Sequence, residues 1–111
     1  MAPPTGLNIK TSSVIRLVKE EKSYHNELVL QTSLLTRLES GEEIEGYDIK
    51  QQKTVVEQTK EVIPQVRQKL KVAVEQLEYA IDAAPESESA ESIEKAKSAV
   101  AEGKQVLKTA L

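Results

Sequence analysis

The sequence predicts an all-α protein: an up-down-up three-helix bundle, shaped as an elongated rod of long, coiled-coil-like helices. Leu, Val, Ala, Glu, Lys and Gln dominate while Phe and Trp are absent, which favours helices over a β-sandwich or barrel. Apolar residues recur at heptad spacing over long stretches instead of alternating. Turn-forming residues separate these stretches at positions 40–46 and 85–89.

The first part of the chain is expected to be a flexible arm at residues 1–8, rich in proline and glycine, which precedes a bundle at residues 9–111. The first helix of this bundle is predicted at about residues 10–39. Glu21 and Gln31 are polar interruptions of its inward stripe. The apolar members of the stripe are Val14, Leu17, Tyr24, Leu28, Leu35 and Leu38.

The second helix is predicted at about residues 48–84, with Asp48 as its N-cap and Gln51 in capping-box spacing. Further apolar residues widen its stripe on both sides, so this helix is expected to pack against both of the others. Its heptad a positions recur at strict seven-residue intervals and are Ile49, Val56, Ile63, Leu70, Leu77 and Ala84. The d positions between them are Thr59, Val66, Ala73 and Ala80.

Pro64 lies inside this second pattern. An interior proline removes one helical hydrogen bond and costs about 3 kcal/mol unless the helix bends around it. Because the apolar register continues from Val56 through Ile63 to Leu70, we expect one continuous helix with a kink at Pro64.

The third helix is predicted at about residues 89–110, capped by Ser87 or Ser89. Its inward residues are expected to be Ile93, Ala96, Val100 and Leu107. Short connections make neighbouring helices antiparallel, so the chain should run up, down and up again.

Composition and motifs argue against several functional classes. The net charge of −3 argues against nucleic-acid binding, and there is no cysteine for thiolate metal sites. No apolar run is long enough to span a membrane, and a cytoplasmic location is expected. The only histidine, His25, flanks the core stripe and is expected to be solvated. We therefore expect no enzyme, no catalytic residues, no cofactor and no metal.

The surface suggests a protein partner. Apolar residues lie off the inner stripes (Ile15, Val29, Leu30, Val72 and Tyr79), and cations cluster on the first two helices (Lys10, Arg16, Lys19, Lys22, Lys50, Lys53, Lys60, Arg67, Lys69 and Lys71). Ordinary solubility also accounts for such residues, and both interpretations stay open. The predicted partner-binding residues are Lys10, Ile15, Arg16, Lys19, Val29, Lys50, Lys53, Val72 and Tyr79.

Three segments resemble the tubulin-binding cofactor A family. Residues 9–20 (IKTSSVIRLVKE) are similar to the family's IKT…V.RLVKE run, and residues 47–52 (YDIKQQ) to its YDIKKQ segment. Ile63-Pro64, followed by Arg67 and Leu70, resembles its IPD..RRL stretch. The resemblance covers about residues 9–84, whereas the third helix shares only length and charge.

The chain also departs from the family pattern at a few positions. Gln65 stands where the family usually has Asp, and Val62 where it usually has Met. Ser12 and Ser13 replace the commoner Gly-Val pair. Contacts that the family makes through the Gly-Val pair are therefore not inferred for Ser12 and Ser13.

The resemblance implies a three-helix bundle of the cytoplasm and microtubule cytoskeleton that captures quasi-native β-tubulin released from the chaperonin. It implies that the subunit is passed toward heterodimer assembly, with handover to other tubulin-folding cofactors possible. The residues alone leave an alternative, a structural adaptor or coiled-coil scaffold subunit unrelated to tubulin. They do not decide between a monomer and a homodimer.

Overall fold

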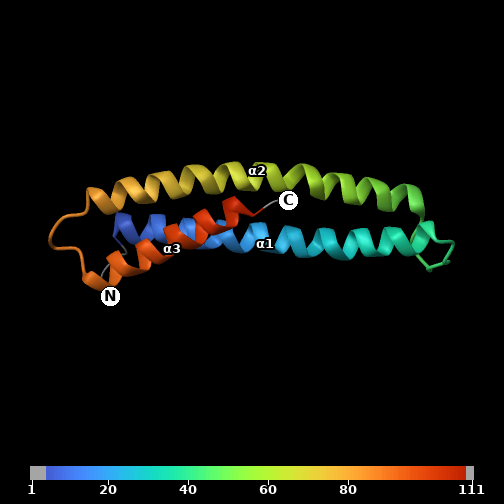
Figure 1. Ribbon diagram of the computed structural model, residues 1–111, viewed down its shortest axis with the longest axis horizontal. Coiled ribbons are helices and arrows are strands. Elements are labelled where there is room, and N and C mark those ends of the chain that lie inside the picture. The colour runs from blue at the N-terminus through green and yellow to red at the C-terminus, as the bar shows by residue number, and fades with distance from the viewer. Residues whose placement is uncertain (1–4, 110–111) are drawn as a thin grey trace.

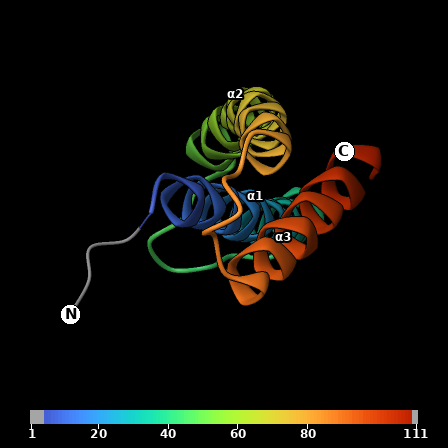
Figure 2. The same ribbon diagram turned by 90° about the vertical axis from the view of Figure 1, so that its left-hand side faces the viewer.

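The computed structural model describes residues 5–109, which form three helices: α1 (Gly6–Glu39), α2 (Ile49–Asp82) and α3 (Ala90–Lys108). The helices run up, down and up, and α3 lies beside only one half of the α1–α2 pair (Figure 1). Viewed from the end, the three helices form a triangle (Figure 2). With dimensions of 63 × 30 × 16 Å, the molecule is the elongated all-α rod that the sequence predicts.

The helix starts confirm two of the predicted caps. The Asp48 carboxylate accepts a hydrogen bond from the backbone N–H of Gln51 at 2.9 Å. The Ser89 hydroxyl accepts one from the backbone N–H of Ser92 at 3.1 Å. Each side chain satisfies a backbone donor that lacks a partner within its helix, which explains why α2 and α3 begin there.

The start of α1 differs from the prediction. The Thr5 hydroxyl accepts a hydrogen bond from the backbone N–H of Asn8 at 3.1 Å, so α1 begins at Gly6. Residues 6–8 therefore belong to the helix rather than to the predicted flexible arm. The remainder of that arm, residues 1–4, lies outside the described residues, as do residues 110–111 at the end of the predicted third helix.

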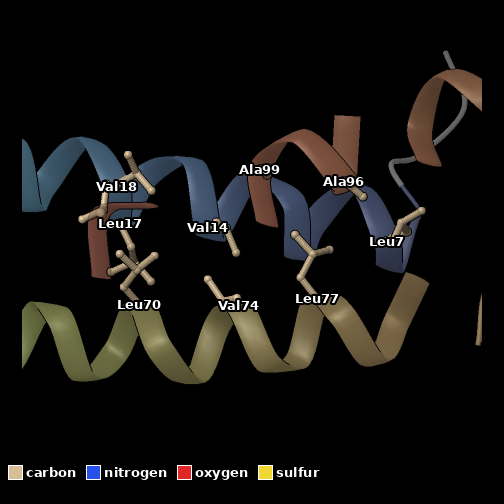
Figure 3. Packing of buried hydrophobic residues seen from close by; sticks show 10 residues of the cluster. Leu7, Val14, Leu17, Val18, Leu70, Val74, Leu77, Ala96 and Ala99 are labelled. Atoms are coloured by element: carbon tan, nitrogen blue, oxygen red, sulfur yellow. The ribbon is translucent and has the colours of Figure 1, made fainter. Parts of the chain in front are cut away.

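The core lies where all three helices meet, and its side chains point toward one another (Figure 3). Val14, Leu70 and Leu77 are 0% exposed. Leu70 lies on the central helix as predicted. The buried members of this cluster are Leu7, Val14, Leu17, Val18, Leu70, Val74, Leu77, Ala96, Ala99 and Val106.

The third helix packs through small residues. Ala96, Ala99 and Gly103 are buried, whereas the predicted Ile93 is only partly buried, as are Val100 and Leu107. A Cβ atom on Gly103 would lie 2.6 Å from Cγ2 of Val74. The backbone of α3 therefore approaches α2 more closely than larger side chains would permit.

Beyond the end of α3 the rod is a two-helix hairpin. At a rise of about 1.5 Å per residue, the 19 residues of α3 cover only about 28 Å of the length of the α1–α2 pair. The predicted core residues Tyr24, Leu28 and Leu35 lie in the uncovered half and are only partly buried. They lack the third helix that buries Val14.

The second helix continues through Pro64 without interruption, as predicted. Proline deprives the Lys60 carbonyl of its helical donor. Both residues are exposed, so this carbonyl lies on the solvent side of the rod. A kink at Pro64 stays a prediction.

Candidate partner-binding surfaces

The predicted partner-binding residues are all exposed, but they do not form one patch. Lys10 and Tyr79 line the same surface pocket, where the start of α1 meets the end of α2. Ile15 lies in a groove between α1 and α3. Arg16 belongs to a separate hollow along α1. Exposure agrees with the prediction for every member of the set: Lys10, Ile15, Arg16, Lys19, Val29, Lys50, Lys53, Val72 and Tyr79.

A second group of these residues lies in the half of the rod without α3. Val29 is 68% exposed on α1, and Lys50 and Lys53 are exposed near the start of α2. Val72 does not belong to this group, because it shares the outer face of α2 with Tyr79, seven residues further on. The structure thus divides the predicted set between the two halves of the rod.

Arg67, which the sequence placed among the exposed cations, is withdrawn from the surface. Its side chain is 16% exposed, and Nη1 donates to the Glu21 carboxylate at 3.1 Å. Glu21 itself is buried, and its carboxylate also contacts His25. His25 is therefore half-buried beside an acid, not solvated as expected. A buried carboxylate requires such partners because water no longer solvates its charge.

The same guanidinium also holds the end of α3. Arg67 Nη1 donates to the carbonyl of Val106 at 3.2 Å, and Nη2 donates to those of Leu107 and Thr109 at 2.9 Å. The last carbonyls of a helix have no intrahelical donor and carry partial negative charge, so a cation stabilises them. The only sequence signal for this cluster was the acid Glu21 at an inward heptad position.

A second polar cluster lies inside the two-helix half. The side-chain amide of Gln52 donates to the backbone carbonyl of Gln31 at 3.0 Å. The hydroxyl of Thr59 donates to Gln31 Oε1 at 2.6 Å. The polar interruption at Gln31 is thus paired across the helix interface, which favours a single register of α1 against α2.

Ion pairs fasten the edges of the bundle. Lys22 on α1 lies 3.1 Å from Glu102 on α3, and Glu78 on α2 lies 2.9 Å from Lys104 on α3. All four side chains are at least 42% exposed, so each pair contributes at most about 1 kcal/mol. These ion pairs therefore help to orient α3 but contribute little to the stability of its packing.

The first loop has its own ion pair. Arg37 at the end of α1 donates from Nε to Glu42 at 3.0 Å. This hydrogen bond, reinforced by the opposite charge, lowers the pKa of Glu42 and raises the pKa of Arg37. Part of the acidic charge of the loop is therefore neutralised locally.

Within residues 5–109, no group of His, Cys, Asp or Glu side chains is placed to hold a metal ion. In the same part of the chain, no helix is both long enough and apolar enough to cross a membrane.

Known proteins are similar to this chain in sequence and in fold. The family model described as "Tubulin binding cofactor A" matches residues 2–100. Tubulin-specific chaperone A of Saccharomyces cerevisiae is 31% identical over 104 residues, which cover 94% of this chain and 95% of the yeast protein. The crystal structure of tubulin folding cofactor A from Arabidopsis thaliana superposes with a TM-score of 0.76 at 31% identity, covering 89% of this chain and 92% of that one. The chain therefore belongs to the tubulin binding cofactor A family.

Proposed function

We propose that this protein is a chaperone, not an enzyme, that captures quasi-native β-tubulin after its release from the chaperonin. It acts in the cytoplasm and passes the subunit toward assembly of the α/β-tubulin heterodimer, with handover to other tubulin-folding cofactors. Membership of the family carries this proposal, because the family model and the yeast and plant relatives are all named for tubulin.

The shape of the molecule supports capture over a broad surface. A 63 Å rod offers long helical faces, while its loops are short and lie at the two ends. Exposed cations on α1 and α2 suit an acidic partner, and exposed apolar residues such as Val29 and Tyr79 provide anchors. Charge should mainly govern the association rate, and desolvated apolar contacts the dissociation rate.

Charge reversal tests whether the helical faces bind β-tubulin. Replacing Lys10, Arg16 and Lys19 by Glu should weaken capture of β-tubulin in low salt, with a smaller difference in high salt. The matched control reverses three acids of the first loop (Glu42, Glu43 and Glu45 to Lys) and should leave capture nearly unchanged. Circular dichroism must first show that both variants are folded.

The two possible failures have different meanings. If the loop variant fails and the helix variant binds normally, the helical-face model is wrong. If the parent protein does not bind β-tubulin at all, the chaperone proposal itself falls. Recovery of a cytoskeletal scaffold in its place would support the structural adaptor.

A further inference from the structure

The face that binds α3 continues beyond the end of α3. In the covered half, this face is marked by Val14 and Lys22 on α1, and by Val74 and Arg67 on α2, all of which meet α3. Residues at seven-residue spacing share one side of a packed helix. By this spacing, the same side of the uncovered half, here called the distal face, contains Leu28, Val29, Leu35, Lys53 and Lys60. It also contains Lys50, which lies one helical turn before Lys53.

The distal face keeps apolar residues where a third helix would pack. Leu28 and Leu35 follow Val14 in the heptad and are only partly buried, whereas Val14 is 0% exposed. Val29 follows Lys22 by seven residues and is 68% exposed. From Glu21, beside the end of α3, to Leu38 near the end of α1, the rise of about 1.5 Å per residue leaves about 25 Å, room for a helix of about four turns.

The α2 edge of the distal face is basic. Lys50, Lys53 and Lys60 lie along it, and the acid between them, Glu57, is 3.7 Å from Lys60. Within residues 5–109, neither Lys50 nor Lys53 has a carboxylate within 4 Å. In the covered half, Glu102 of α3 pairs with Lys22 on the α1 edge of the face that binds α3. Lys104 of α3 pairs with Glu78 on the α2 edge. A helix on the distal face would need acids on the side that lies along α2.

We propose that the distal face docks an amphipathic helix of the partner, which lies end to end with α3 and completes the bundle. This helix has an apolar stripe over Leu28, Val29 and Leu35 and acidic residues along Lys50 and Lys53. The inference rests on the proposed function, so the partner that supplies the helix is β-tubulin.

Neighbouring residues on α1 provide a matched test. Val29 and Leu30 are 68% and 70% exposed, yet successive helical residues point about 100° apart, so only Val29 lies on the distal face. The chain has no cysteine. Val29→Cys and Leu30→Cys can therefore each carry one photo-crosslinker attached through a maleimide. After irradiation with β-tubulin, Val29→Cys should give the higher yield, and the cross-linked tubulin peptide should be helical, amphipathic and acidic on one side.

Binding measurements give an independent readout. The Val29→Asp, Lys53→Glu double variant should bind β-tubulin about tenfold more weakly, because both the apolar contact and the charge complementarity are lost. Leu30→Asp should bind like the parent. Val29, Leu30 and Lys53 are all exposed, so circular dichroism should show parental helix content for both variants.

Each result has a defined meaning. Equal cross-linking from both positions, or unchanged binding by the double variant while the parent binds, overturns docking at the distal face and leaves the proposed function intact. Cross-linking of Val29→Cys to a second copy of this chain assigns the face to a homodimer and also overturns the proposal. Failure of the parent to bind β-tubulin removes the proposed function and this inference together.

Discussion

The Glu21 carboxylate on α1 lies 3.1 Å from Nη1 of Arg67 on α2, and the same guanidinium donates to the last carbonyls of α3. One side chain therefore connects all three helices. Glu21 is 3% exposed, so its charge depends on protein partners instead of water. This cluster marks the position along the rod where the three-helix half ends.

Removing Arg67 should destabilise the protein strongly. Arg67→Met removes the arginine partner of the buried Glu21 carboxylate and leaves several helix-end carbonyls without their donor. Loss of one partner of a buried pair costs about 3–5 kcal/mol. Urea unfolding measures the loss. Arg67→Lys should not restore stability, because an ammonium group lacks the planar fork that reaches Glu21 and α3 together.

A double variant separates the charge from the packing. Glu21→Met combined with Arg67→Met should recover much of the stability lost in Arg67→Met alone, because no unpaired buried charge remains. Additive losses in this cycle would show that the two groups do not interact. Hydrogen exchange at the end of α3 should stay faster than in the parent, since its carbonyls still lack a donor.

Leu70 tests the position of the core. It is 0% exposed and lies within 3.6 Å of the position that a Cβ of Gly103 would occupy. Leu70→Ala should lower the free energy of unfolding by about 2–5 kcal/mol through lost burial and the cavity left behind. The exposed Leu30→Ala is the control and should change it by less than about 0.5 kcal/mol. A Leu70→Ala change as small as that of the control would contradict this packing.

Gly103→Ala should destabilise the bundle, although alanine is the better helix former. The gain in helix propensity is about 1 kcal/mol. The new methyl group would lie 2.6 Å from Cγ2 of Val74, which is itself buried, and overpacking a tight core costs about 1–3 kcal/mol. We expect a net loss of about 1 kcal/mol in denaturant unfolding. A rise in stability would mean that α3 moves outward at no cost.

Pro64→Ala should leave α2 intact and keep or raise stability, because alanine restores the backbone donor that the Lys60 carbonyl lacks. Circular dichroism and thermal unfolding measure both. If a bend at Pro64 shapes the tubulin-binding surface, affinity for β-tubulin should fall while stability holds. Unchanged affinity would limit Pro64 to a structural role.

The Arg37–Glu42 pair predicts a small pH dependence. Its hydrogen bond lowers the pKa of Glu42 in the folded state, so its stabilisation is complete above the unfolded pKa and is lost as the pH falls through the folded one. Glu42→Gln should therefore differ from the parent in urea midpoint at neutral pH and converge with it in acid. Glu43→Gln is the neighbouring control and should keep the parental urea midpoint at neutral pH. Added salt should reduce the difference at neutral pH because the pair is exposed.

Local sequence patterns determined the elements of this protein. Heptad spacing, the capping side chains of Asp48 and Ser89 and the intervening turns predicted three helices, because each signal acts within a few residues of chain. The same patterns predicted that Leu70 is buried and that Val29 and Tyr79 are exposed, as the structure confirms. The segments that resemble the cofactor A family are also short stretches of contiguous sequence, so the sequence by itself indicates the family.

Only the tertiary structure decided which faces are covered. The heptad marks Leu28 and Val14 alike as inward, yet α3 reaches only Val14, because its length and its contacts through Ala96 and Gly103 determine where it lies. Arg67 looks like any other cation in the sequence, and its withdrawal depends on Glu21, 46 residues away along the chain. Contacts between distant segments depend on how the helices pack together. The residue spacing within one helix does not indicate which residues of the other helices it contacts.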